Sequence, residues 1–274
     1  MKIGFLGFGE VASTLSRGLI NQGADLATCV EGRSSRTKDT AGKSGVTLYK
    51  SNKELAENSD ILLSAVTPFQ AVKVAQEVGN YVNGIYVDIN NVSPKTVKEA
   101  LSFIENGRTV DASIIGSIKK GFSTHIISSG KFADEFADLN KYGMNISIIG
   151  DEIGQASAIK MLRSSFTKGI SALLFETLYS AYKMGIDDQV LNIIAETECE
   201  SFKDSAVSRI ISSSLHSKRR CEEMKEVIEL ISENNNPKMS KATEEFFKSL
   251  YNEINRLEKR PENYRDVFKL FDKE

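Results

Sequence analysis

The sequence predicts an α/β domain with a doubly wound, mainly parallel sheet, followed by an all-α domain. Through residue 150, short β-branched or apolar runs alternate with helical stretches, which is the rhythm of βαβ units. A glycine-rich turn at Gly7 and Gly9 stands between the first run and the first helix. After Gly150 no strand pattern recurs, and long amphipathic segments run to the end of the chain.

Eight runs have the length and the apolar or β-branched content of strands. The run at 61–66 is nearly all apolar, as expected for a strand that helices cover on both faces. The predicted strands are residues 3–6, 26–30, 47–49, 61–66, 85–89, 109–112, 125–128 and 145–149.

Capping and turn residues mark the helices between these strands. Ser51 with Glu54 three residues later forms a capping box, and Pro94 lies in a first helical turn, where proline loses no hydrogen bond. The predicted helices of this half are 11–22, one that begins after Ser51, one from Thr67-Pro68 to about 78, one from Pro94 and one near 132–139. The change of pattern predicts two domains, residues 1–150 and residues 151–274.

The charge balance limits the kinds of partner. The 274 residues include 35 basic and 37 acidic side chains, a net charge of −2, which excludes a polybasic protein that binds nucleic acid or anionic lipid through its overall field. No window approaches 18 apolar residues, and the apolar run at 3–8 meets Glu10 at once, unlike a signal peptide. We expect a soluble, cytoplasmic protein that binds neither nucleic acid nor membranes.

The cysteines and histidines do not suggest a metal site. Cys29, Cys199 and Cys221 are far apart and form no C-x-x-C pair, and the chain has only two histidines. We expect reduced thiols and no bound metal.

The segment Gly7-Phe8-Gly9-Glu10-Val11-Ala12 matches the G-x-G-x-x-G/A fingerprint of dinucleotide-binding Rossmann domains. Gly7 permits a tight turn, Gly9 lets a pyrophosphate approach the backbone, and Ala12 keeps the helix close to the sheet. The N-terminus of the helix offers unpaired N–H groups to the anion. Because the segment lies between a predicted strand and a predicted helix, we expect it to bind a dinucleotide cofactor.

The end of the second predicted strand bears on the choice between NAD and NADP. An acidic residue there would bind the ribose 2′-hydroxyl of NAD, whereas arginine accommodates the 2′-phosphate of NADP. The segment 31–37 carries both signals, Glu31 as well as Arg33 and Arg36. Two arginines with hydroxyls such as Ser34 suit a phosphate better than one carboxylate suits a diol, so NADP is predicted. Arg36 alone is equally explained as a solvated loop charge.

Two other strand ends are candidate ligand contacts, because ligands in open α/β sheets lie beyond the carboxyl ends of the strands. Val66 and Thr67 follow the fourth predicted strand and are expected to line the cofactor site. Asn91 follows the fifth and is expected to face the nicotinamide carboxamide or the substrate. A capping role ahead of Ser93-Pro94 explains Asn90-Asn91 equally well.

A polar stripe runs along the otherwise apolar segment Gly154–Ala172 at helical spacing. A lysine partly desolvated in a cleft has a lowered pKa and can serve as a general acid or base near neutral pH. An ordinary amphipathic helix with a solvated polar face would give the same pattern, so both interpretations stay open. The stripe consists of Ser157, Lys160, Ser164, Thr167, Lys168 and Ser171.

The chain resembles the β-hydroxyacid dehydrogenase superfamily, which includes 3-hydroxyisobutyrate and 6-phosphogluconate dehydrogenases, over essentially its whole length. It is most similar to the NADP-binding, 6-phosphogluconate dehydrogenase-like proteins with a distinct C-terminal helical domain. Residues 154–164 match the superfamily motif G-x-x-x-x-x-K-x-x-x-N, with Lys160 at the catalytic lysine and Ser164 in place of the asparagine. The resemblance implies that Lys160 assists proton transfer at the substrate hydroxyl while hydride moves to the nicotinamide, with Ser164 as the second catalytic position.

The superfamily's substrate loop, roughly D-A-P-V-S-G-G, corresponds to residues 111–117. The resemblance implies substrate contacts from Ser113, Ile115, Gly116 and Ser117. Ile115 replaces the substrate-binding serine and Ser117 replaces the second glycine. These departures argue against 3-hydroxyisobutyrate and 6-phosphogluconate as substrates.

The basic run at 216–220 resembles the region where the superfamily places a further basic residue near the active site. His216, Arg219 and Arg220 are therefore candidates to bind an anionic substrate group or relay a proton. A solvated basic helix start, with Lys218 and Glu222 as an i,i+4 pair, explains the same run. Superfamily members commonly dimerise through the helical domain, so a homodimer is expected.

These observations predict an NADP-dependent oxidoreductase that transfers a hydride between the nicotinamide and a small, anionic hydroxy or keto substrate, with Lys160 as general acid or base. Reduction of an imine on the same scaffold is one alternative. The departures at Ile115 and Ser164 favour another, a non-catalytic NADP(H)-binding sensor or assembly protein.

Overall fold

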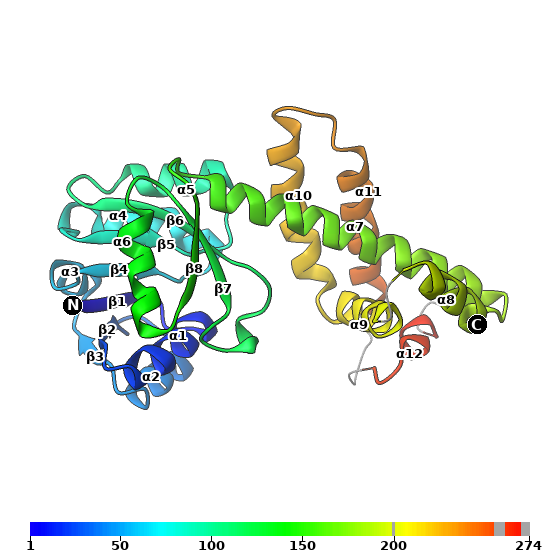
Figure 1. Ribbon diagram of the computed structural model, residues 1–274, viewed down its shortest axis with the longest axis horizontal. Coiled ribbons are helices and arrows are strands. Elements are labelled where there is room, and N and C mark those ends of the chain that lie inside the picture. The colour runs from blue at the N-terminus through cyan, green and yellow to red at the C-terminus, as the bar shows by residue number, and fades with distance from the viewer. Residues whose placement is uncertain (199–200, 255–260, 270–274) are drawn as a thin grey trace. The chain divides into compact units, whose positions relative to one another are not determined.

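The computed structural model describes residues 1–198, 201–254 and 261–269 (Figure 1). The chain divides into a first unit, Met1–Lys160, and a second unit that begins at Met161. The long helix α7 (Gln155–Lys183) contributes residues to both units. Cys199 lies outside the described residues, whereas Cys29 and Cys221 are buried free thiols.

The first unit is built on an eight-stranded sheet in the order β3-β2-β1-β4-β5-β6-β7-β8 (Figure 1). All neighbouring strands pair in parallel except β6 and β7, which confirms the predicted mainly parallel sheet and all eight predicted strands. After β3 the chain crosses to the other side of β1, and this reversal leaves a crevice beyond the carboxyl ends of β1 and β4. The strands are β1 (Lys2–Leu6), β2 (Asp25–Cys29), β3 (Thr47–Tyr49), β4 (Ile61–Ser64), β5 (Ile85–Asp88), β6 (Arg108–Ile114), β7 (His125–Ser129) and β8 (Asn145–Gly150).

Helices cover both faces of this sheet, because successive strand side chains point to opposite sides. Along β4, Ile61 and Leu63 pack in the apolar core on one face of the sheet, and Leu62 packs in the core on the other face. This explains why the run is apolar throughout. One core contains α1 (Glu10–Asn21), α2 (Ser35–Gly42) and α6 (Ala133–Ala137), and the other contains α3 (Asn52–Glu57), α4 (Ala71–Val78) and α5 (Pro94–Ser102).

Helix α2 is a difference from the sequence-based expectation, which treated the segment after the second strand as a loop. Its eight residues, SRTKDTAG, are nearly all polar and contain one buried residue, Ala41, so no amphipathic pattern marks the helix. Ser34 caps it by accepting a hydrogen bond from the Thr37 N–H.

The second unit is helical throughout its described residues. The C-terminal part of α7 packs with α9 to α12 around Phe175, Met224, Phe247 and Phe268. None of the described helices is both long and apolar enough to cross a membrane. Beyond α7, the helices are α8 (Asp187–Thr197), α9 (Phe202–Leu215), α10 (Ser217–Ser232), α11 (Lys238–Ile254) and α12 (Tyr264–Phe268).

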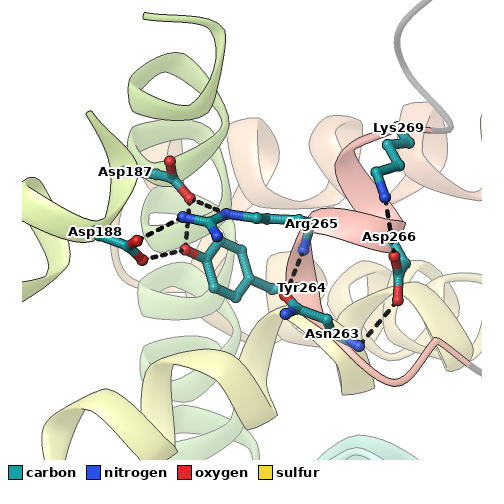
Figure 2. Close-up of polar contacts among 7 residues, drawn as sticks. All are labelled: Asp187, Asp188, Asn263, Tyr264, Arg265, Asp266 and Lys269. Carbon is teal, nitrogen blue, oxygen red and sulfur yellow. Dashed lines mark hydrogen bonds and ion pairs between the residues drawn. The ribbon is translucent and has the colours of Figure 1, made fainter. Parts of the chain in front are cut away.

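A buried carboxylate holds the short helix α12 against the start of α8 (Figure 2). The Tyr264 hydroxyl and Arg265 Nε each donate to Asp187 Oδ2 at 2.6 Å, and Arg265 also pairs with Asp188 at 2.9 Å. Burial acts to raise the pKa of Asp187, but the hydrogen bonds from Arg265 and Tyr264 outweigh it, so this pKa lies below its ordinary value. The contact therefore stabilises the fold most when Asp187 is ionised.

We expect Asp187→Asn to lower the free energy of unfolding by about 2 kcal/mol at pH 7, the cost of weakening hydrogen bonds to a charged group. Because the folded-state pKa of Asp187 is lowered, its contribution is fully present above the ordinary pKa of about 3.9 and is lost as the pH falls through the folded-state pKa. Urea denaturation followed by circular dichroism at pH 7 and at steps down to pH 3 measures this.

The matched control is Asp138→Asn, which removes an exposed aspartate paired with Lys141 and should change stability little at any pH. A cost for Asp187→Asn that is the same at pH 3 and pH 7 would contradict the account.

Candidate functional site

The turn between β1 and α1 requires glycine at Gly7 and leaves space at Gly9. Gly7 has φ +83°, and a Cβ there would lie 2.7 Å from the Ala65 carbonyl oxygen, so both conformation and close approach exclude a side chain. At Gly9 no heavy atom lies within 4 Å of the position a Cβ would take. The open space above Gly9 fits the approach of a phosphate to the N-terminus of α1.

A pocket of about 350 Å³ opens over this turn, within the first unit. Residues that follow the carboxyl ends of β1, β2 and β4 line it, which is where a dinucleotide binds in this type of sheet. Eight of the predicted cofactor residues line it, together with Thr37, Ala65 and Gln70. The eight are Gly7, Phe8, Gly9, Glu10, Val11, Arg33, Val66 and Thr67.

The other predicted cofactor residues have different positions. Ala12 is fully buried in the core beneath the turn, consistent with its expected packing role. Ser34 caps α2, and Arg36 is exposed on α2. Ser34, Arg36 and Asn91 are not part of the pocket lining.

Arg33 is the basic group of this pocket. Its Nε is buried and has no hydrogen-bond partner among the described residues. A buried donor without a partner costs free energy, so an arginine in this state points to an acceptor supplied by a ligand. A phosphate group fits this donor and the adjacent N-terminus of α2.

Asn90 ties the carboxyl ends of β4 and β5 together. Its side chain accepts a hydrogen bond from the Val66 N–H at 2.7 Å and donates to Ser64 Oγ and Asp88 Oδ2, both at 3.0 Å. The capping role considered for Asn90-Asn91 belongs to Ser93, which accepts from the Thr96 N–H. Asn90 therefore fixes the backbone of Val66 in the wall of the pocket.

Two buried aspartates lie side by side on neighbouring strands, Asp88 on β5 and Asp111 on β6. Burial raises the pKa of Asp88 to about 6; hydrogen bonds from Asn90 and the charge of Lys160 oppose the rise, while the charge of Asp111 adds to it. Burial also raises the pKa of Asp111, against hydrogen bonds from Ser157, Gly154 and Ser129. Sequence reasoning missed Asp88 as a site residue, although an acidic residue that ends an apolar strand is a visible signal.

Lys160 lies in the first unit, one turn into α7 and half-buried. Its charge favours the ionised form of Asp88, the residue at the carboxyl end of β5. Because β1, β4 and β5 are parallel, this end belongs to the same edge of the sheet as the Gly7–Gly9 turn.

The rest of the polar stripe is not a solvated face. Ser157, Lys168 and Ser171 are buried, so the interpretation of α7 as an ordinary amphipathic helix is wrong for these positions. Lys168 donates to Ser164 Oγ and pairs with Glu223 at 2.8 Å in the second unit, and burial lowers its pKa. Ser164 is thus a partner of Lys168 within α7.

The predicted substrate loop lies at the carboxyl end of β6. Ser113 is fully buried within β6, and its Oγ has no hydrogen-bond partner among the described residues, so its role as a substrate contact stays a prediction. The Ile115 N–H donates to the His125 carbonyl, and Gly116 turns the chain with φ +93°. Ser117 is exposed and caps the short helix η3 (Ile118–Lys120).

The residues of the basic run at 216–220 have two different environments. His216 and Arg219 line a pocket of about 430 Å³ with Lys218, Glu222 and Tyr251 among its walls. Arg220 is instead half-buried, donates to Ser212 and Ser213, and lies over the Phe247 ring. Burial lowers its pKa to about 10. These contacts give Arg220 a packing role, and its expected role in substrate binding stays a prediction.

Within the described residues, no group of three His, Cys, Asp or Glu side chains could hold a metal ion.

The two glycines of the turn give a matched pair of variants. Gly7→Ala should cost about 2 kcal/mol of stability, because alanine is strained at positive φ and its Cβ would contact Ala65. Gly9→Ala should leave the melting temperature unchanged, since Gly9 has φ −87° and no atom lies where the new Cβ would stand. The same Cβ would fill the space that a phosphate needs, so NADPH binding should weaken about tenfold or more. Differential scanning fluorimetry and NADPH fluorescence measure the two effects. Unchanged NADPH affinity in Gly9→Ala would place the cofactor elsewhere.

Two family models match parts of the chain, one in each unit. Residues 2–92 match the family described as NADP oxidoreductase, coenzyme F420-dependent, and residues 181–250 match a domain of unknown function, DUF1932. An uncharacterized 28.5 kDa protein of Methanothermus fervidus is 48% identical over 251 residues, which is 91% of this chain and 99% of that protein.

Solved structures agree with this assignment. The conserved protein MTH1747 of unknown function, described as structurally similar to 3-hydroxyacid dehydrogenases, is 45% identical with a TM-score of 0.84 over 98% of this chain and 99% of that one. A Mycobacterium tuberculosis 3-hydroxyisobutyrate dehydrogenase shares the fold, with a TM-score of 0.79 at 13% identity over 99% of each chain. The chain therefore belongs to the family of 3-hydroxyacid dehydrogenase-like proteins, in which a nucleotide-binding oxidoreductase domain precedes a DUF1932 helical domain.

Proposed function

We propose that this protein is an NADP-dependent oxidoreductase that transfers a hydride between the nicotinamide and a small hydroxy or keto substrate, with Lys160 as the general acid or base. The observation that carries the proposal is that the start of α7, the helix that bears Lys160, is hydrogen-bonded to Asp111, the strand partner of Asp88, at the sheet edge that also bears the Gly7–Gly9 turn. A proton donor and a dinucleotide cradle at one edge are the two parts that carbonyl reduction needs.

Each residue of the site in the first unit has its own proposed role. The first turn of α1 and Gly9 would hold the pyrophosphate, Arg33 the 2′-phosphate, and Val66 and Thr67 the opposite wall. The bound nicotinamide supplies or accepts the hydride at C4. During reduction, the Lys160 ammonium donates a proton to the developing alkoxide oxygen and regains one from solvent, and during oxidation the neutral amine accepts it.

The proposed substrate is a small anion. His216, Lys218 and Arg219 line the pocket of the second unit, and they support binding of a carboxylate or phosphate. A homodimer through the second unit is part of the proposal, and the apolar side chains exposed along α7, Leu162, Phe166 and Leu173, support it.

Preference for NADP is tested at Arg33. Arg33→Ala should weaken NADPH binding about 10- to 100-fold and NADH binding about twofold or less. The reason is that only NADPH carries the ribose 2′-phosphate that the buried Nε would bind. Fluorescence titration of both cofactors measures this. Arg36→Ala is the matched control, since Arg36 is exposed outside the pocket lining. Tighter binding of NADH than of NADPH by the unaltered protein would overturn the choice of cofactor.

Turnover is tested with a panel of hydroxyacids, ketoacids and cyclic imines, with NADP⁺ or NADPH as appropriate and absorbance at the nicotinamide band as the readout. On any substrate that reacts, Lys160→Ala should lower kcat about 10²- to 10⁴-fold, the range expected for loss of a general acid. Lys73→Ala, on the exposed face of α4, is the control and should leave kcat unchanged. Full turnover by Lys160→Ala removes the catalytic role, and tight NADPH binding with no turnover on the panel favours the sensor or assembly protein.

A further inference from the structure

The helix that carries Lys160 begins without a cap of its own. Gly154 directly precedes α7, and its carbonyl accepts the first helical hydrogen bond, from the Ala158 N–H. A glycine has no side chain to satisfy the free N–H groups of the first turn. A side chain would be strained here, because Gly154 has φ +100°, a conformation that L-residues rarely adopt.

The sheet supplies the missing cap. Asp111 on β6 accepts hydrogen bonds from the Gly154 N–H at 3.1 Å, the Ser157 N–H at 3.0 Å and the Ser157 hydroxyl at 2.7 Å. Ser129 on β7 accepts from the Ala156 N–H at 3.1 Å, and its hydroxyl donates to Asp111 at 3.4 Å. Asp111 thus receives four hydrogen bonds, three of them from the start of α7.

This arrangement differs from the other capped helices of the first unit. Ser34, Ser51 and Ser93 each cap the helix that follows them in the chain, which satisfies a backbone N–H but fixes the helix to nothing else. A cap borne by two strands instead fixes the first turn of α7 to the sheet of the first unit. Lys160 is three residues beyond Ser157, on the same face of the helix.

We propose that Asp111 is the positioning residue for Lys160. It acts through Ser157 and the first turn of α7 to hold the amine beside the carboxyl ends of β5 and β6, and it contacts no ligand, since its side chain is fully buried. The inference rests on the proposed function in one respect, that Lys160 is the group whose position matters for the reaction. That Asp111 fixes Lys160 is a separate claim, which needs no substrate to test.

The first experiment follows Lys160 in the full-length protein alone. Limited acetylation with acetic anhydride, read by mass spectrometry, compares the labelling of Lys160 with that of exposed Lys73 in the same sample. Ser157→Ala and Asp111→Asn should each raise the relative labelling of Lys160 about fivefold or more, the factor that corresponds to loss of a helix cap. Ser157→Ala removes only the hydroxyl donor, so it carries the test if Asp111→Asn does not fold.

The matched control is Asp187→Asn, which alters a buried, multiply bonded carboxylate that holds a helix of the second unit. It should destabilise the protein without changing the relative labelling of Lys160. Unchanged labelling in folded Asp111→Asn and Ser157→Ala overturns the inference, whatever the protein catalyses. An equal rise in Asp187→Asn overturns it as well, because the effect would then be general loss of stability.

The second experiment uses a substrate found in the panel. Both variants should lower kcat about 100-fold while KM and NADPH affinity change about twofold or less, as expected for misplacement of a proton donor. Retained kcat in both variants, with kcat lost in Lys160→Ala, overturns the positioning role and leaves the proposed function standing. Retained kcat in Lys160→Ala overturns the proposed function, because the position of Lys160 would then not matter for catalysis. The labelling experiment would still decide whether Asp111 fixes the position of Lys160.

Discussion

The buried carboxylate of Asp111 at the start of α7 is the interaction on which the arrangement of the site depends. Gly154 cannot cap the helix, so the first turn is held by β6 and β7 through Asp111 and Ser129. A carboxylate at a helix N-terminus also has a favourable interaction with the helix dipole. Four hydrogen bonds and that field oppose the desolvation of Asp111 but do not cancel it, since its pKa stays raised. The same hydrogen bonds attach the first turn of α7 to the sheet.

The nucleotide end of the site follows from a second constraint, the close approach of β1 and β4. Gly7 turns the chain against the Ala65 carbonyl, which aims the first turn of α1 at the crevice. Asn90 then holds Val66 in place across that crevice. Arg33 lies at the end of β2, in the lining of this pocket, and its buried Nε has no hydrogen-bond partner among the described residues, which supports the proposal that the pocket binds an anion.

The sequence was sufficient for features that are local in the chain. Strand runs, the glycine fingerprint and the change to helices after Gly150 each depend on neighbouring residues, and the structure confirms the fold class. Helix α2 was missed because its polar residues carry no periodic signal. Asp88 and the capping role of Asp111 depend on strand register, which brings residues 23 positions apart into one pair, and no local pattern encodes it. The burial of Ser113 and the packing of Arg220 on the Phe247 ring also depend on residues that are distant in the chain, so no local pattern encodes them.

The most direct test of the account is a crystal structure of the protein with NADPH. The account predicts the 2′-phosphate on Arg33, the pyrophosphate above Gly9, and Lys160 Nζ within about 4 Å of the place where a carbonyl oxygen would stand beside nicotinamide C4, the reach of a proton donor. A nicotinamide ring bound away from Lys160, or a lysine turned to Asp88 alone with no open position between it and C4, would contradict the central claim.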